Sequence, residues 1–235
     1  MTDRPDLRYE IKMACQEAGY SQFMMALRLH PAGISKLYPS RWVQSVYLDT
    51  LDDQALEENL AGISHREKVR YRWYGLDSEV VRGTLECKVR ENSLGWKRTE
   101  KLDGDVQIEG AERGAFMRRL RELTSDAWTE DLSSSLMPVQ WIRYEREYYA
   151  TADKKVRITL DRNVASWDLR YRPTLSCQIA SHLPNILIIE AKCAEEHYDE
   201  AQSIVARLPV QVDRCSKFVL ASDQQHGPHP SLMPD

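Results

Sequence analysis

The sequence alternates between apolar and charged residues in five short segments, and this alternation constrains the fold more than any other feature. In residues 7–13, Leu, Tyr, Ile and Met occupy the odd positions, whereas Arg, Glu and Lys occupy the even ones. Successive side chains of a β-strand point to opposite faces, so this segment predicts a strand with one wholly charged face. The same split recurs at 68–74, 85–90, 156–161 and 189–193.

Any one of these segments fits an antiparallel sheet that buries its apolar face and exposes its charged face to water. The five together are harder to explain in this way, because Arg and Lys dominate the charged rows and like charges on neighbouring strands repel. A sheet that closes on itself, with charged faces inward and apolar faces covered by helices, would place these cations around a lumen. Arg and Lys together bind phosphate oxygens well, so this lumen is predicted to bind a linear polyphosphate.

The remaining segments complete an α+β fold. Strands are also predicted at 43–49, 95–102 and 141–150, and helices at 16–30, 53–60 (capped by Asp52), 111–123, 197–208 and 213–221. Hairpin-like succession of the strands predicts a large antiparallel sheet. Closure of this sheet around the charged rows would give an antiparallel β-barrel or tunnel of about eight strands, with a charged lumen and flanking helices. We expect residues 1–222 to form a single domain and 223–235 to form a disordered tail.

Composition narrows the classes of protein further. The five cysteines are odd in number and form no CxxC pair, so the sequence predicts neither a disulfide framework nor a zinc site. With a net charge of -4, any anion site has to come from a local arrangement of cations. The sequence contains neither a long apolar run nor a signal peptide, and we therefore expect a cytoplasmic protein. A Gly-rich phosphate loop is also missing.

A series of short motifs gives the sequence a family resemblance. The motifs are RYEIK at 8–12, SVYLDT at 45–50, KVRYRWYG at 68–75, LECK at 85–88, KR at 97–98, YER at 144–146, RITLDR at 157–162, IEAK at 189–192 and SKF at 216–218. In order and spacing they resemble the polyphosphate polymerase (VTC) domain of the triphosphate tunnel metalloenzyme superfamily. The hydrolase branch of that superfamily usually opens with Glu-x-Glu-x-Lys. Arg8 replaces the first Glu here, which is similar to the polymerase branch.

The resemblance implies a role for most of the charged residues in the rows. Glu190, with Glu10 and Glu86, would hold Mn²⁺ or Mg²⁺, hard cations that prefer oxygen ligands. The expected catalytic cations, which clamp the donor and the growing chain, are Lys12, Arg70, Arg72, Lys88, Arg146, Arg157 and Lys217. Further substrate contacts are expected from Arg8, Lys68, Arg90, Arg98, Lys192 and Ser216. Asp49 and Asp161 are expected instead to pair with neighbouring Arg residues or to cap loops.

Three functions remain open at this point. The first is an ATP-dependent polyphosphate polymerase, a polyphosphate kinase-type phosphotransferase that binds ATP and polyphosphate. The second is a metal-dependent tripolyphosphatase or nucleoside triphosphatase on the same fold, which only Arg8 disfavours. The third is a binding module without catalysis, for polyphosphate or for the triphosphate end of RNA. The leading hypothesis involves no nucleic acid, and the sequence leaves the oligomeric state open.

Overall fold

The computed structural model describes residues 9–92, 94–132, 135–181, 183, 185–212 and 216–226. Its main element is a nine-stranded antiparallel sheet with the order β11-β1-β10-β9-β8-β2-β3-β5-β6. The strands are β1 (Tyr9–Gln16), β2 (Ser35–Asp49), β3 (His65–Tyr74), β5 (Thr84–Glu91), β6 (Leu94–Lys101), β8 (Met137–Ala150), β9 (Arg157–Asp168), β10 (Ile186–Cys193) and β11 (Gln211–Val212). Two further short strands, β4 (Val80–Val81) and β7 (Val106–Gln107), pair with each other.

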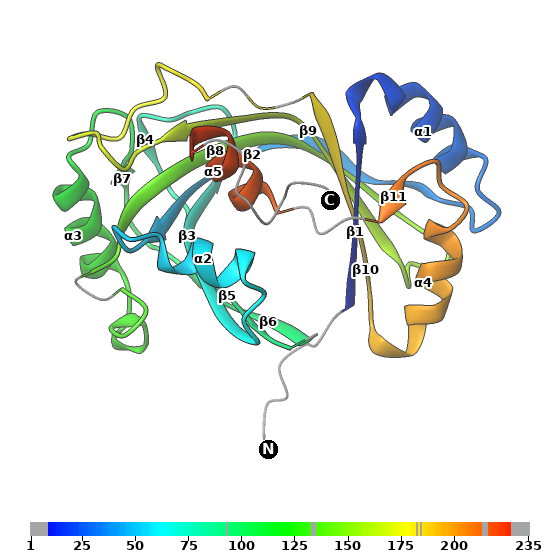
Figure 1. The fold of residues 1–235 in the computed structure, drawn as a ribbon, viewed down its shortest axis with the longest axis horizontal. Coiled ribbons are helices and arrows are strands. Elements are labelled where there is room, and N and C mark those ends of the chain that lie inside the picture. Colours follow the sequence, from blue (N-terminus) through cyan, green and yellow to red (C-terminus); the bar gives the residue numbers. More distant parts are fainter. Residues whose placement is uncertain are drawn as a thin grey trace.

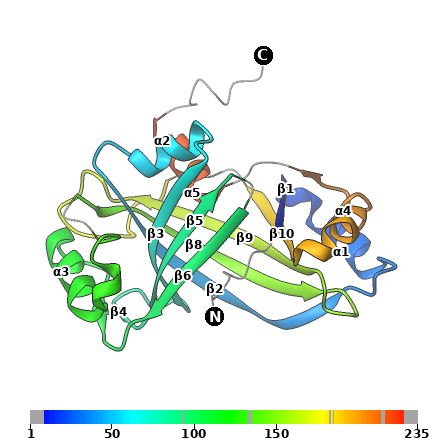
Figure 2. The same cartoon turned by 90° about the horizontal axis from the view of Figure 1, so that it is seen from below.

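The sheet is strongly curled, as Figures 1 and 2 show, but it is not a closed barrel. Among the described residues, its hydrogen-bonded order ends at β6 on one side and at β11 on the other. β11 pairs with Met13 and Ala14 and so occupies part of the edge of β1 that a closing strand would need. The α+β class and the antiparallel sheet are therefore confirmed, whereas the sheet does not close as expected.

Three helices cover the apolar outer face of the sheet, as the sequence predicted. Figure 1 shows α1 (Tyr20–Arg28) and α4 (Tyr198–Val205) outside β1 and β10, and α3 (Arg113–Leu123) outside the opposite half. The core beneath α1 and α4 includes Phe23, Ile158, Ile189 and Ile204, and the core beneath α3 includes Tyr71, Trp73, Leu85, Cys87, Phe116 and Leu120. Burial of these side chains turns the charged rows of the same strands toward the inside of the curve.

Two other helices, α2 (Gln54–Leu60) and α5 (Lys217–His226), lie inside the curve (Figure 1). Their apolar residues pack on the concave sides of β2 and β8, in a cluster that contains Tyr47, Leu56, Ile142, Tyr144 and Phe218. Helices therefore cover the outer face, as expected, but α2 and α5 also pack on the concave face, which the sequence did not predict. The concave face is apolar at α2 and α5, and it becomes charged beyond them.

The ends of several elements differ from the sequence-based expectation. The predicted helix at 16–30 is a 3-10 turn (Glu17–Gly19) followed by α1, and two further 3-10 turns lie at Asp126–Trp128 and Glu195–His197. Asp49, and not the expected Asp52, caps the start of α2. The Asp49 carboxylate accepts hydrogen bonds from the backbone N–H groups of Ala55 and Leu56 at 2.9 and 3.1 Å. This confirms the capping role expected for Asp49.

The C-terminal helix α5 continues to His226, so the first residues of the expected tail are helical, and residues 227–235 lie outside the described part of the chain. Among the described helices, none combines the length and the apolar character needed to cross a membrane.

Candidate active site

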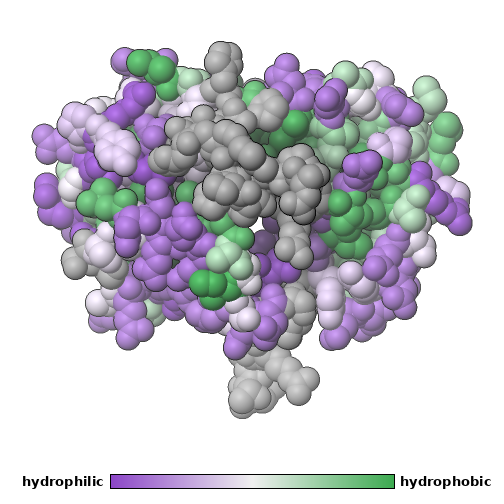
Figure 3. All heavy atoms as spheres, in the orientation of Figure 1, coloured by the Kyte–Doolittle hydropathy of each residue, from purple (hydrophilic) through white to green (hydrophobic). Residues whose placement is uncertain are grey.

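The charged rows meet at a cavity inside the curl that encloses about 110 Å³. Figure 3 shows a hollow between hydrophilic side chains near the middle of the molecule. The cavity is lined by Glu10, Lys12, Tyr47, Lys68, Arg70, Glu86, Lys88, Lys97, Tyr144, Arg146, Glu190, Lys192, Ser216, Lys217 and Phe218. Eight of these side chains are cationic and three are carboxylates, so the lining carries a formal excess of five positive charges.

Strand register explains why these residues meet. On one wall Arg70 lies opposite Glu86 across β3 and β5, and Lys88 lies opposite Lys97 across β5 and β6. On the other wall Lys12 lies opposite Glu190, and Glu10 lies opposite Lys192, across β1 and β10. Residues directly opposite one another in an antiparallel pair share a face of the sheet, so each ladder adds to the same charged surface.

Glu86 is the centre of the first wall, formed by β3, β5 and β6. It accepts hydrogen bonds from Arg70 Nε and Nη2 at 2.9 and 2.7 Å and from Lys97 Nζ at 3.0 Å, and it forms an ion pair with Arg72 Nη2 at 2.7 Å. Its side chain is 1% exposed. Burial raises the pKa of Glu86, but Arg70, Arg72 and Lys97 lower it by more, to about 2. Glu86 is therefore a permanent anion with both oxygens in use.

Asp161 and Glu190 anchor the second wall, formed by β1, β10, β9 and β8 together with α5. Asp161 is fully buried and accepts both Nε and Nη2 of Arg146, at 2.6 and 2.7 Å, and Lys217 Nζ lies 2.5 Å from it. Lys192 Nζ donates to Glu190 Oε2 at 2.8 Å. Burial lowers the pKa of Lys217, but Asp161 and Glu190 raise it by more. The expected pairing of Asp161 with an Arg is confirmed.

Glu10 connects the two walls. Its Oε2 accepts a hydrogen bond from Lys88 Nζ at 3.1 Å, across the gap between β1 and β5. Its Oε1 is buried and accepts no hydrogen bond, with Lys12 Nζ at 3.4 Å. Burial and the nearby Glu190 raise the pKa of Glu10, but Lys88, Lys192 and Lys12 lower it by more, to about 2. Glu10 is thus ionised and retains one oxygen for another partner.

Lys68 differs from the other lining cations. Its Nζ donates to Ser216 Oγ at 3.1 Å and lies 5.6 Å from the centre of the Phe218 ring. Within the described part of the chain it forms no ion pair with a carboxylate. Burial and then the neighbouring cations, Lys12 first among them, lower the pKa of Lys68 well below its usual value. An anionic ligand would relieve this repulsion.

Most of the predicted site residues lie together in this cavity. Eleven of them line it: Glu10, Lys12, Lys68, Arg70, Glu86, Lys88, Arg146, Glu190, Lys192, Ser216 and Lys217. Arg72 lies behind the lining and contacts it through Glu86.

The other predicted residues lie elsewhere. Arg90 donates to the backbone oxygen of Asn92 at 3.2 Å, and Arg157 is exposed at the first position of β9. Arg98 is paired with Cys87 in the strand register and bonds Asp131, so it lies on the outer face and not in the cavity. Arg8 lies outside the described residues.

Sequence reasoning missed Lys97, Tyr47, Tyr144 and Phe218 among the lining residues. The signal for Lys97 was available, because Trp96 packs against the outer core and strand alternation then places Lys97, rather than Arg98, on the charged face. Nothing comparable marks the aromatic residues, which belong to the cluster around α2 and α5.

The carboxylates differ in how well they fit a divalent cation. Among the described residues, Oε1 of Glu10 is buried without a hydrogen bond, and the ion-pair partner of Glu190 Oε1 is Lys217 Nζ at 3.5 Å. Both are ionised oxygen donors of the kind that Mn²⁺ and Mg²⁺ accept. Glu86 does not fit, because cations already contact both of its oxygens. The expected metal role of Glu86 is therefore not supported by its surroundings.

The curled antiparallel sheet gathers Lys and Arg around a few ionised carboxylates on its concave face, and this defines a class of protein with a cationic cavity inside a curled sheet. The chain belongs to the VTC domain family, whose model matches residues 8–226. The resemblance to the triphosphate tunnel superfamily is thereby confirmed, and it supports a triphosphate-binding protein of phosphoryl transfer. No curated protein matches the sequence.

Among solved structures, the chain is similar to a Vibrio parahaemolyticus protein provisionally described as an adenylate cyclase. The TM-score is 0.53 at 10% identity, over 92% of this chain and 99% of that one, and this similarity shows the fold alone. A chain of the Schizosaccharomyces pombe Mediator head module (TM-score 0.45, 7% identity, 86% and 92% covered) and the Mimivirus capping enzyme triphosphatase (TM-score 0.36, 10% identity, 86% and 90% covered) are too distant to carry an argument.

Proposed function

We propose that this protein is an ATP-dependent polyphosphate polymerase, which transfers the γ-phosphate of ATP to the end of a polyphosphate chain and releases ADP. The observation that carries the proposal is the formal excess of five positive charges in one cavity of a VTC domain. Phosphoryl transfer requires little covalent chemistry from the protein and depends on positioning and on neutralisation of charge. A lining of this kind supplies both along a linear polyanion.

The cations divide into fixed and adjustable groups. Arg146 is held in place by a bidentate contact to Asp161, and Arg70 by two hydrogen bonds to the same oxygen of Glu86. Both guanidinium groups line the cavity. Lys12 and Lys88 are compact point charges on flexible stems and would follow the phosphates of the donor and the growing chain. Lys217, beside Ser216 at the start of α5, would orient the terminal phosphate whose oxygen attacks the γ-phosphorus.

Glu190 and Glu10 would hold Mn²⁺ or Mg²⁺ in this enzyme. The ion would neutralise negative charge on phosphate oxygens that develops during transfer. Both carboxylates stay ionised because the surrounding lysines lower their pKa values. The proposed role of Glu86 is structural: it fixes Arg70, Arg72 and Lys97.

The test is incubation of the purified protein with ATP and Mn²⁺ or Mg²⁺, with and without a short polyphosphate primer. Products are resolved by gel, and ADP and free phosphate are followed separately. A polyphosphate ladder with matching ADP is expected. Free phosphate without polymer would replace the proposal with a tripolyphosphatase or nucleoside triphosphatase, and binding without turnover would replace it with a binding module. Lys217→Ala, which removes the proposed contact to the terminal phosphate, should lower synthesis. Arg98→Ala removes a cation from the outer face and is its control.

A further inference from the structure

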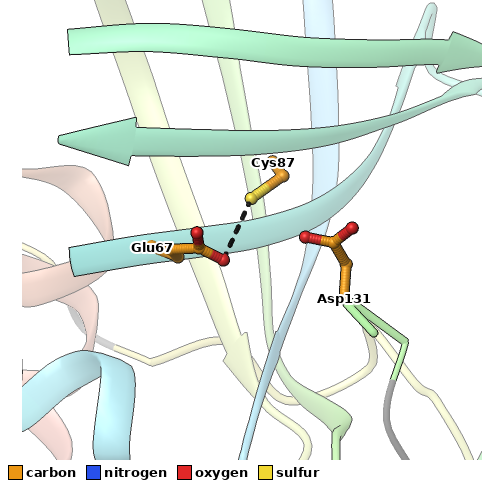
Figure 4. A group of neighbouring side chains, drawn as sticks. All are labelled: Glu67, Cys87 and Asp131. Atoms are coloured by element: carbon orange, nitrogen blue, oxygen red, sulfur yellow. Dashed lines mark hydrogen bonds between the residues drawn. The ribbon is translucent and has the colours of Figure 1, made fainter. Parts of the chain in front are cut away.

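A second cluster of potential metal ligands lies on the outer face of the sheet, away from the cavity. It consists of Glu67 on β3, Cys87 on β5 and Asp131 in the segment after the 3-10 turn Asp126–Trp128 (Figure 4). One potential ligand atom from each residue lies within 4.8 Å of the other two. Cys87 lies between Glu86 and Lys88, and alternation along β5 sends its side chain away from the cavity that those two line.

Asp131 supplies a second observation that points to a ligand. The residue is 8% exposed, and its Oδ2 is buried without a hydrogen-bond partner. Its other oxygen bonds Arg98, whose guanidinium also lies over the Trp128 ring. Figure 4 shows the carboxylate turned toward Cys87 from the side opposite Glu67. Burial of a carboxylate oxygen without a partner destabilises the fold, and a bound cation would remove that cost.

The spacing of the other two ligands suits a tetrahedral ion. Cys87 Sγ donates to Glu67 Oε2 at 3.6 Å. Zinc bonds of about 2.3 Å to sulfur and about 2.0 Å to oxygen place the two ligand atoms roughly 3.5 Å apart in a tetrahedron. The second oxygen of Glu67 lies 3.6 Å from His65 Nε2, so the imidazole can orient that carboxylate from behind.

The charges around the cluster also balance. With Cys87 as a thiolate, the three ligands carry three negative charges, Arg98 carries one positive charge, and a divalent cation makes the group neutral. A thiolate combined with carboxylates favours zinc over the hard cations that suit the cavity. We propose that Glu67, Cys87 and Asp131 bind one Zn²⁺, with water as the fourth ligand, and that binding releases the Cys87 thiol proton.

A zinc ion here would fasten the segment after α3 to the sheet. Trp128 and Leu132 on either side of Asp131 are buried in the core that also contains Cys87. The three ligands come from separate parts of the chain, so no CxxC or similar spacing announces the site in the sequence. The proposed zinc site is independent of the metal site proposed for the cavity, since the two lie on opposite faces of the sheet.

The test uses the full chain, stripped with a chelator and titrated with Co²⁺ as a spectroscopic substitute for Zn²⁺. One equivalent of Co²⁺ is expected to produce a thiolate-to-cobalt charge-transfer band, which one equivalent of Zn²⁺ then displaces. Cys87→Ala should abolish the band, and the half-exposed Glu67→Gln should weaken Co²⁺ binding at least tenfold. Cys177→Ala is the matched control, because this thiol also has a carboxylate neighbour, Glu109, and its band should remain.

Circular dichroism verifies that each variant is folded. Glu190→Gln should retain the band, which separates this site from the one in the cavity. Absence of a thiolate band in the unmodified chain would overturn the proposal. A band that persists in folded Cys87→Ala, or that disappears in Glu190→Gln, would overturn it as well.

Discussion

The two walls of the cavity use the same residue types in different ways. On the wall of β3, β5 and β6, Glu86 is saturated, because two arginines and Lys97 contact its two oxygens. On the wall of β1 and β10, Glu10 keeps a buried oxygen without a hydrogen bond, and Glu190 has a weakly engaged Oε1. A charged row therefore fixes which residue types face inward. The number of hydrogen-bond donors around each carboxylate then decides whether that carboxylate can bind a metal.

The first prediction concerns the rate of synthesis and the wall of β1 and β10, where Glu190 lies. Glu190→Gln removes a charged metal ligand but keeps the size of the side chain, and it should lower the rate of polyphosphate synthesis by about 10³-fold, as loss of a group that stabilises transition-state charge does. The rate is measured as ADP release at saturating ATP. Glu86→Gln, scaled to the folded fraction, should lose much less. Equal losses in the two variants would contradict the division of labour between the walls.

The loss of folding stability should be larger in Glu86→Gln than in Glu190→Gln, which is the reverse of their order in activity. Glu86→Gln leaves Arg70, Arg72 and Lys97 without their shared counter-charge, and breaking a buried ion pair in this way costs about 3–5 kcal/mol. Denaturant unfolding without ligand measures this loss. Glu190→Gln should cost less, since Asp161 still bonds Arg146 and contacts Lys217. Saturating tripolyphosphate should restore part of the loss in Glu86→Gln, and no recovery would argue against anion binding at this wall.

Lys97 and Arg98 are neighbouring cations on β6 whose side chains lie on opposite faces of the sheet. Lys97→Ala should weaken tripolyphosphate binding about tenfold, the size expected for one charge-assisted hydrogen bond. Arg98→Ala should leave the affinity unchanged, because its side chain lies on the outer face. Calorimetric titration of both variants provides the measurement. A weaker affinity in Arg98→Ala alone would reverse the assignment of faces.

The last and smallest predicted effect is an uptake of protons when a polyanion binds. Burial and neighbouring cations lower the pKa of Lys68, and a bound polyanion should raise it again. At a pH between the two values, binding takes up protons, so affinity should fall as pH rises through that interval. Calorimetry in two buffers of different ionisation enthalpy counts the protons. Lys68→Met should remove this uptake, and unchanged uptake in the variant would assign it to another group.

Alternation predicted the charged concave face and most of its lining, because strand geometry fixes facing once the period is known. The same rule assigned Lys12, Arg70 and Glu190 correctly. Arg98 was expected to contact substrate through the family resemblance, but it lies on the outer face, as alternation from Trp96 indicates. The sequence did not reveal that α5 lies inside the curl, because Phe218 and Tyr47 meet only through tertiary packing. The saturation of Glu86 was also out of reach, since it depends on side chains from three strands.

The open edge of the sheet has a consequence for how a long polymer reaches the site. In the described residues, the edge strands β6 and β11 do not pair with each other, and the ion pair between Glu10 on β1 and Lys88 on β5 connects the two walls next to this open side. Lys88 is 47% exposed, and such a pair contributes about 1 kcal/mol or less. This side of the cavity is therefore held together by a weak ion pair and not by a hydrogen-bonded pair of strands. If the proposed function holds, a polyphosphate enters the site from the side, at any point along its length, without an end having to be threaded.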